Sequence, residues 1–182
     1  MSNHIRPAQT ADIPAILAIY NDAVLNTTAS YDYEPSTLQQ RTLWFEQHQQ
    51  QGFPVLVAVN DADIVVGWGS LSKFREKIGY QFSVEHSVYV DAAQRRQGIG
   101  RLILGALIEA AQTMGKHTMI GGVDASNEAS LCLHRSLGFE QVAHFKQVGY
   151  KFDRWLDLVF FQRSLDTPVE KSVPESVTAH SD

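Results

Sequence analysis

Cysteine is almost absent from this sequence: Cys132 is the only one among 182 residues. A single thiol excludes an intrachain disulfide framework, so a hydrophobic core has to hold the fold together. Hydrophobic residues make up 44% of the chain, and a chain of this length buries roughly 70% of the surface that it exposes when unfolded. The sequence therefore predicts a domain that needs neither a disulfide nor a metal to fold.

An excess of basic residues is also missing, because 15 lysines and arginines stand against 20 aspartates and glutamates. This balance disfavours a non-specific nucleic-acid binder. No apolar run approaches the roughly 18 residues that span a bilayer, and the first residues lack the pattern of a secretory signal. The seven histidines show no metal-ligand spacing. We expect a cytoplasmic protein without a nucleic-acid, membrane or metal partner.

The length of the chain corresponds to one domain. Its last segment begins at Asp166, contains Pro168 and Pro174, and has no apolar periodicity. Such a composition is typical of a disordered terminus. We therefore expect a folded domain over residues 1–165 and a disordered tail over residues 166–182.

Hydrophobic periodicity alternates between the helical and the extended pattern along the folded part. The pattern predicts strands at residues 5–8, 55–59, 64–71, 81–90, 117–123, 140–146 and 156–162. It predicts helices at residues 10–24, 37–50, 100–114 and 127–137, with Thr10 capping the first and Ser36 or Thr37 capping the second. Strands that alternate with helices, with hairpins at both ends, indicate a mixed α/β sheet.

The segment Gln94-Arg-Arg-Gln-Gly-Ile-Gly-Arg101 connects a predicted strand to the most strongly predicted helix. Its glycines allow close approach of a ligand to the main chain, and free N–H groups at a helix start attract anions. We interpret the loop as a pyrophosphate site, with a solvated turn as the alternative. A dinucleotide fingerprint would need a third glycine where Ile103 stands, and a Walker A loop would need Lys and Ser or Thr after Gly100.

Two motifs carry a family resemblance. Arg95–Gly100 matches the Gln/Arg-x-x-Gly-x-Gly/Ala acyl-CoA loop of the GNAT N-acetyltransferases, and Asn127–Phe139 follows their Asn-x-x-Ser-x-x-Leu-Tyr-x-x-x-Gly-Phe pattern except at His134. The segments Glu85–Val90 and Gly149–Asp157 resemble the phosphinothricin and methionine sulfoximine acetyltransferases. The resemblance covers residues 5–165. It implies the GNAT (acyl-CoA N-acyltransferase) fold, an α/β fold with a central mixed, mostly antiparallel twisted sheet flanked by helices.

The resemblance also implies acetyl-CoA as co-substrate and assigns residues to it. The backbone of three strand residues would pair with the pantetheine arm, namely Val88, Tyr89 and Val90. Seven loop residues would surround the pyrophosphate, namely Arg95, Arg96, Gln97, Gly98, Ile99, Gly100 and Arg101. Asn127 and Ser130 would bind the pantetheine, although Asn127 could instead simply cap its helix.

Acetyl transfer to an amine needs a base for the ammonium proton and donors for the developing oxyanion. Glu85 is the candidate base, because it lies in an apolar-flanked strand where partial burial would raise its pKa. The N–H of Val88 is the candidate oxyanion donor. The alternative for Glu85 is an ordinary outward-facing strand residue. His134 could protonate the leaving thiolate, act as a second base, or be structural.

Acceptor recognition is expected from three places that the resemblance puts around the acceptor. These are the loop Arg75, Glu76 and Lys77, the strand segment Glu85, His86 and Ser87, and an aromatic wall from Tyr31. Arg75 would bind a carboxylate or phosphinate, although a charged turn is more often only solvated. A regular strand would turn His86 to the face opposite Glu85. Residues 149–157 would lie at the acceptor pocket or at the contact of a homodimer.

We therefore expect an enzyme that moves acetyl from acetyl-CoA to the α-amino group of a small amino-acid analogue such as phosphinothricin, methionine sulfoximine or methionine sulfone. One alternative is a GNAT acetyltransferase for another amine, such as a protein N-terminus, a polyamine or an aminoglycoside. A second is a non-catalytic CoA-binding sensor, in which Glu85 would be dispensable.

Overall fold

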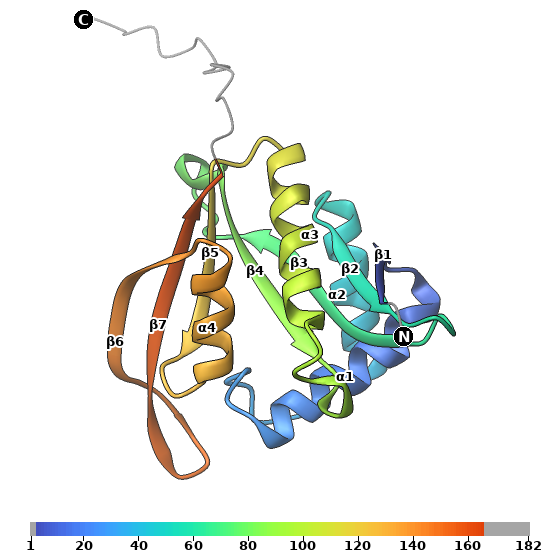
Figure 1. Ribbon diagram of the computed structural model, residues 1–182, viewed down its shortest axis with the longest axis horizontal. Helices are drawn as coiled ribbons and strands as arrows, with labels where there is room; N and C mark the ends of the chain where they lie inside the picture. Colours follow the sequence, from blue (N-terminus) through green and yellow to red (C-terminus); the bar gives the residue numbers. More distant parts are fainter. Residues whose placement is uncertain (1–2, 166–182) are drawn as a thin grey trace, which may run out of the picture.

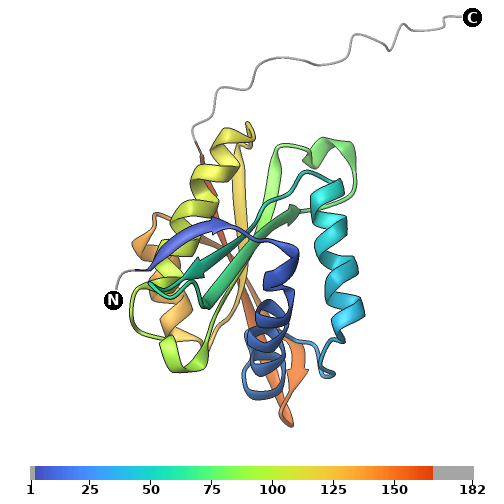
Figure 2. The same cartoon turned by 90° about the vertical axis from the view of Figure 1, so that its right-hand side faces the viewer.

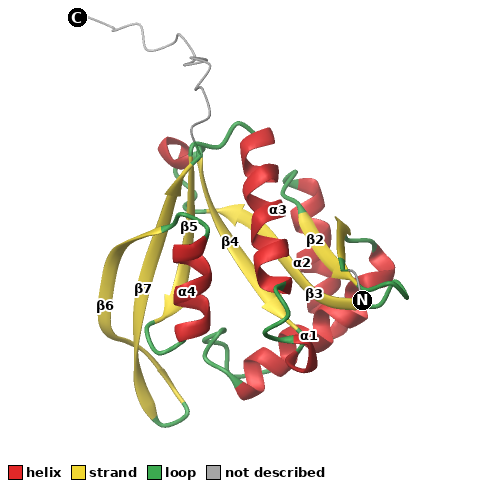
Figure 3. Cartoon of the chain, in the orientation of Figure 1, coloured by secondary structure: helices red, strands yellow, loops and turns green. Residues whose placement is uncertain are grey.

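The computed structural model describes residues 3–165, which form one seven-stranded sheet with helices on both faces (Figure 1; Figure 3). The strands are β1 (His4–Pro7), β2 (Val55–Val59), β3 (Val65–Lys73), β4 (Ser83–Val90), β5 (Thr118–Asp124), β6 (Glu140–Lys151) and β7 (Arg154–Ser164). The α-helices are α1 (Ile13–Asn26), α2 (Leu38–Gln50), α3 (Ile99–Thr113) and α4 (Glu128–Ser136). The tail expected to be disordered, residues 166–182, lies outside the described residues.

The order of strands in the sheet is β1-β2-β3-β4-β5-β7-β6. All neighbours are antiparallel except β4 and β5, so the sheet is mixed and mostly antiparallel, as expected. The parallel pair is short, because only Ser83–Glu85 of β4 is in register with Thr118–Ile120 of β5. Beyond Glu85 the two strands diverge, as Figure 1 shows, and the sheet opens in its middle.

The helices divide between the two faces of the sheet (Figure 2). α3 and α4 cover one face, where their buried residues Ile103, Leu107 and Leu131 share a core with Val84 of β4. α1 and α2 cover the other face with a second core, which includes Ile16, Phe45 and Trp68. The apolar stripe predicted for residues 100–114 is the buried face of α3. Each face of β4 therefore borders a different core.

The start of the first helix differs from the prediction, and the start of the second confirms it. Thr10 does not cap α1, because a 3₁₀ turn precedes the helix and Asp12 accepts the Gln9 N–H at 2.8 Å instead. Asp12 also pairs with Arg6 at 2.6 Å, and this ion pair lowers the pKa of the Asp12 carboxyl. Thr37 caps α2 by accepting the Gln40 N–H at 3.2 Å.

The last two strands are longer than predicted. β6 and β7 form a hairpin that continues through residues 147–151 and 154–155, which lie outside the strands predicted at residues 140–146 and 156–162. The periodicity breaks because the register shifts between Phe145 and Gly149, where Gln147 has a φ of 50°. The actual turn is Phe152-Asp153, and both residues have left-handed backbone angles.

Residues 3–165 contain neither a candidate membrane span nor a candidate metal-binding cluster. No helix there is long and apolar enough to span a membrane. No group of three or more His, Cys, Asp or Glu side chains there could hold a metal ion.

Candidate active site

The glycine loop enters α3 through left-handed backbone. Gly98 has a φ of 80°, Arg96 has a φ of 63°, and the first bond of the helix joins the Leu102 N–H to the Gly98 carbonyl at 3.0 Å. No side chain of the described residues caps this end of the helix. The N–H groups of the first turn therefore remain for a ligand, with the positive end of the helix dipole behind them. Ile99 can contribute only its backbone, because its side chain is buried.

Two of the loop arginines are held by neighbouring helices. Arg95 pairs with Asp22 of α1 at 3.3 Å, and Arg101 donates to the Ser136 hydroxyl of α4 at 2.9 Å. Arg96 and Gln97 are exposed. The sequence indicated three arginines around the anion but did not indicate Asp22 or Ser136 as partners, because these contacts form only in the folded chain.

The opening between β4 and β5 continues from the loop toward α4. Val88, Tyr89 and Val90 pair with β3 on one side and lie beyond the short pairing with β5 on the other. Asn127 caps α4 by accepting the Ser130 N–H at 3.1 Å, which confirms the capping alternative and leaves its amide N–H groups for a ligand.

This opening also fits the group that the sequence implies. Gly100 places α3 directly against α4, because a Cβ atom there would lie 3.3 Å from Leu133. Free amides at one end and an unpaired strand edge at the other suit a pyrophosphate followed by an extended amide-bearing arm. The residues present therefore fit acetyl-CoA.

Glu85 lies at the point where β4 leaves β5, on the face covered by α1 and α2. The side chain is half-buried, and a Cβ atom on Gly122 of β5 would lie 3.9 Å from Glu85 Oε1. Burial raises the pKa of the Glu85 carboxyl, and the positive charge of Arg75 opposes part of that rise. A carboxylate with a raised pKa at the opening of the sheet is suited to accept a proton.

His134 and His86 form a buried pair on the opposite face. Their rings stack at 5.1 Å, their Nε2 atoms are 3.2 Å apart, and His134 Nδ1 is 2.7 Å from the Ser130 carbonyl. Because a carbonyl only accepts, His134 Nδ1 carries the proton and His134 Nε2 accepts from His86 Nε2. His86 Nδ1 is then an acceptor that is buried without a partner in the described part of the chain.

Both rings are neutral near pH 7. Burial, with the neighbouring His134 as a second cause, lowers the pKa of His86 to about 3, and burial also lowers the pKa of His134. In this arrangement His134 has no free N–H to give to a leaving thiolate, because its one proton is bonded to Ser130. A role for His134 as base or acid remains a prediction. His86 is 8% exposed and faces away from Glu85. The structure therefore keeps His86 off the acceptor side, and this agrees with the regular strand alternation that the sequence predicted.

The β3–β4 loop lies near Glu85. Arg75 lies over the Phe74 ring at 4.2 Å and donates to the Phe74 carbonyl at 2.8 Å, while its charge still acts on Glu85. Glu76 pairs with Lys73 at 3.3 Å in solvent, and Lys77 is exposed. Arg75 is therefore the member of this loop with a physical link to the candidate base.

Tyr31 packs against the β6–β7 hairpin, since a Cβ atom on Gly149 would lie 2.4 Å from its ring. Burial, followed by the charges of Asp124 and Asp157, raises the pKa of Tyr31 to about 12. The same hairpin also holds other residues of the loop between α1 and α2, because Lys151 donates to the carbonyls of Thr27 and Ser30 at 2.9 and 2.6 Å. Tyr31 belongs to the α1–α2 loop and thus packs that loop against the hairpin.

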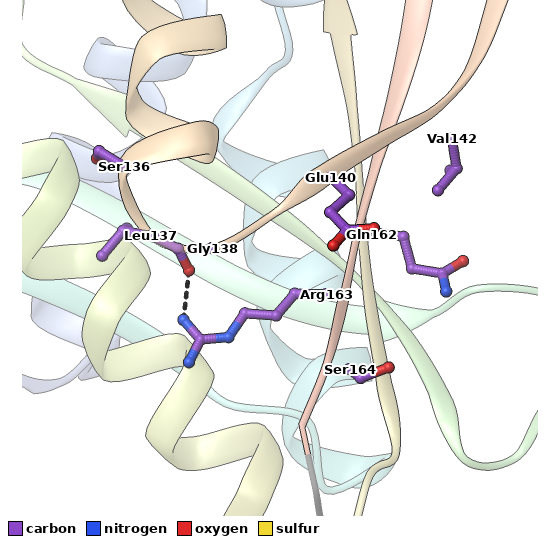
Figure 4. A pocket seen from close by; sticks show the side chains of 8 residues that line it. All are labelled: Ser136, Leu137, Gly138, Glu140, Val142, Gln162, Arg163 and Ser164. Atoms are coloured by element: carbon purple, nitrogen blue, oxygen red, sulfur yellow. Dashed lines mark hydrogen bonds between the residues drawn. The ribbon is translucent and has the colours of Figure 1, made fainter.

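Two cavities lie outside the opening between β4 and β5. One, of about 560 Å³, is at the end of α4 beside β6 and β7, where the Arg163 guanidinium donates to the Leu137 carbonyl (Figure 4). The other, of about 490 Å³, lies between α2 and the β3–β4 pair on the Glu85 face. Ser87 lines this second cavity, so the second cavity is the one that adjoins the candidate base.

Known proteins resemble this chain over almost its whole length. Residues 5–160 match the family described as acetyltransferase (GNAT) domain. The L-methionine sulfoximine/L-methionine sulfone acetyltransferase of Pseudomonas aeruginosa is 49% identical over 166 residues, which cover 91% of this chain and 96% of that protein.

Two solved structures extend the comparison. An acetyltransferase from Salmonella typhimurium with its cofactor acetyl-CoA is 42% identical, with a TM-score of 0.90 over 95% of this chain and 99% of that one. A phosphinothricin acetyltransferase from Sinorhizobium meliloti in complex with acetyl-CoA is 34% identical, with a TM-score of 0.90 over 97% of this chain and 98% of that one. The chain therefore belongs to the GNAT acetyltransferases and is an acetyl-CoA-dependent N-acetyltransferase.

Proposed function

We propose that the enzyme acetylates the α-amino group of a small amino-acid analogue, such as L-methionine sulfoximine, L-methionine sulfone or phosphinothricin. The observation that carries the proposal is the half-buried Glu85 at the opening of the sheet, with the charge of Arg75 acting on it. The activities of the Pseudomonas and Sinorhizobium relatives support the choice of acceptor.

The proposed chemistry begins with a proton. An α-ammonium group with a pKa of about 8 has no lone pair, so Glu85 accepts its proton directly or through a water molecule. The free amine then attacks the thioester carbonyl, and the backbone N–H of Val88 stabilises the negative charge on the oxygen. The tetrahedral intermediate collapses when the C–S bond breaks. CoA leaves as the thiol after taking up the proton that the amine nitrogen loses, and the acetylated amine remains. Arg75 binds the acidic group of the acceptor and holds the amine near Glu85.

The two alternative functions that the sequence left open predict different experimental results. An acetyltransferase for a polyamine or an aminoglycoside would meet no acidic group, so it would have no use for Arg75. A CoA-binding sensor would bind acetyl-CoA and release no thiol with any amine.

A thiol-release assay with acetyl-CoA tests the acceptor class. We expect turnover with the sulfone and sulfoximine of L-methionine and with phosphinothricin, and little with polyamines. We expect Arg75→Ala to raise the KM for L-methionine sulfone about 10-fold or more, because one charge-assisted hydrogen bond contributes about 1.5–3 kcal/mol. Arg135→Ala removes an exposed arginine of α4 and serves as the control. Turnover confined to polyamines, or an unchanged KM in Arg75→Ala, would contradict the proposal.

We also propose that the enzyme is a homodimer joined through the β6–β7 hairpin. β6 is an edge strand, and large hydrophobic side chains are exposed along the hairpin, namely Val142, Phe145, Val148, Tyr150, Phe152 and Trp155. Edge strands with exposed apolar residues are normally covered in soluble proteins.

The free, exposed thiol of Cys132 also suits the cytoplasmic location expected from the sequence.

Light scattering after gel filtration tests the dimer. We expect twice the mass of the 182-residue chain for the wild type and the mass of one chain for Phe145→Glu combined with Val148→Glu, because two buried charges would oppose association. Ile78→Glu changes a residue that is 78% exposed elsewhere on the surface and is the matched control. A wild-type monomer at tens of micromolar would refute the homodimer.

A further inference from the structure

α2 contains an arginine that is buried without a carboxylate partner. Arg41 is 6% exposed, and its guanidinium lies 3.8 Å from the Tyr20 ring centre, 4.7 Å from that of Trp44 and 5.6 Å from that of Trp68. None of the ion pairs within residues 3–165 includes Arg41, and its Nε is buried without a hydrogen-bond partner. Aromatic faces attract the cation, but they do not accept its in-plane N–H groups.

Arg41 lines the cavity of about 490 Å³ between α2 and the β3–β4 pair. The floor of this cavity is polar, because the hydroxyl-bearing residues Ser70, Ser72 and Ser87 also line it. A buried guanidinium with no carboxylate within 4.0 Å, on which Asp32 acts only at longer range, lies here beside an open and hydroxyl-lined space. An oxyanion ligand would complete this arrangement.

Strand register connects this cavity to Glu85. The cross-strand pairs on this face are Ser72 with Glu85, Ser70 with Ser87, and Trp68 with Tyr89. Residues two apart on a strand point to the same face and lie roughly 6.6 Å apart, so the Trp68 pair is about 13 Å from the Glu85 pair. Arg41 lies over the Trp68 pair, and Glu85 lies at the other end of the row.

We propose that this cavity is the distal part of the acceptor site and that Arg41 binds a carboxylate on an acceptor longer than a single amino acid. The inference rests on the proposed function, since it assumes that the acceptor amine lies at Glu85. The α-carboxylate of one amino acid is only two bonds from its amine and does not reach Arg41. A tripeptide extends up to about 10 Å, so its terminal carboxylate comes within reach of the Arg41 side chain.

The other charges at the cavity favour a carboxylate over a more highly charged anion. Asp32 and Glu34 line the same cavity from the α1–α2 loop, and both are exposed. Asp32 accepts from the Tyr20 hydroxyl, and no oxygen of Asp32 lies within 4.0 Å of Arg41, so its charge acts on Arg41 only at longer range. Two acidic residues would repel a dianion such as phosphate, whereas a single carboxylate held by the deeper Arg41 meets less repulsion.

A matched pair of acceptors tests the subsite. The probes are the tripeptide L-methionine sulfone-Gly-Gly with a free C-terminal carboxylate and the same tripeptide with a C-terminal amide. We expect the wild type to prefer the carboxylate form at least 10-fold in kcat/KM. In Arg41→Met we expect this ratio to fall to about 1, and in the control Arg135→Met we expect it to stay at the wild-type value.

Arg41→Lys is the second variant, because it retains the charge without the planar fork and protects the test if Arg41→Met does not fold. We expect its ratio to fall several-fold. A wild-type ratio near 1, or a ratio that persists in both Arg41 variants, overturns the inference and leaves Arg41 a structural residue.

The two proposals fail in different ways. If L-methionine sulfone is acetylated but the tripeptides show no carboxylate preference, only the subsite is refuted. If no amino-acid analogue is acetylated, the proposed function fails. Calorimetric titration with the free-carboxylate tripeptide then tests the subsite alone. Tight binding to the wild type and at least 10-fold weaker binding to Arg41→Lys would support the subsite. Equal binding to the two proteins would refute it.

Discussion

Glu85→Gln is expected to lower kcat/KM for L-methionine sulfone by about 100- to 10,000-fold, the contribution of a positioned general base. The amide has nearly the shape of the carboxylate, so the side chain still fills the space beside Gly122 while losing its ability to accept a proton. Steady-state kinetics at saturating acetyl-CoA measures the effect. Glu109→Gln, on the exposed side of α3, is the matched control.

The pH dependence separates a base from a merely structural glutamate. Glu85 acts as a base only when deprotonated, so kcat/KM rises with pH through its pKa. Burial raises the pKa of Glu85, so kcat/KM increases at a higher pH than it would with an exposed glutamate as base. Arg75 opposes the shift, so Arg75→Ala should move the rise to a still higher pH. Full turnover in Glu85→Gln would show that another group takes the proton and would favour a different mechanism.

The parts of the site that the sequence predicted are local in the chain. Gly98 and the apolar stripe of α3 are adjacent, so their pattern alone indicated free amides at a helix start. The capping role of Asn127 likewise depends only on Ser130, three residues further on. Alternation along one strand was sufficient to place His86 and Glu85 on opposite faces.

The parts that the sequence missed depend on contacts between distant segments. Arg41 lies in a polar helix whose pattern indicates a solvated surface, and its burial follows from Tyr20 and Trp68, which belong to other elements. The tautomer of His134 depends in part on His86, which is 48 residues away in the chain. Periodicity within one segment contains no information about such partners.

Gly121 and Gly122 are adjacent on β5 and face opposite sides of the sheet, so the same substitution should affect stability differently at the two positions. A Cβ atom on Gly121 would lie 2.4 Å from His86 Nε2 and 3.0 Å from His134 Nε2, both of which are buried. A Cβ atom on Gly122 would meet Leu158 at 3.5 Å, an ordinary van der Waals contact. The two glycines therefore report separately on the histidine pair and on the Glu85 side.

Gly121→Ala is expected to destabilise the fold by about 3 kcal/mol, since overpacking costs roughly 1–3 kcal/mol and the hydrogen bond between the histidines adds about 1 kcal/mol. In a protein of this size that corresponds to a fall in Tm of about 6–12 °C. Gly122→Ala should leave Tm unchanged or raise it slightly, because alanine restricts the unfolded chain. Thermal unfolding followed by circular dichroism measures both.

The rings cannot move aside easily, because Phe139 packs edge-on against His86 at 5.6 Å and Phe161 stacks on His134 at 5.1 Å. Equal Tm values for the two variants would mean that the histidine pair is loosely packed, and the tautomers derived from its geometry would then lose their basis.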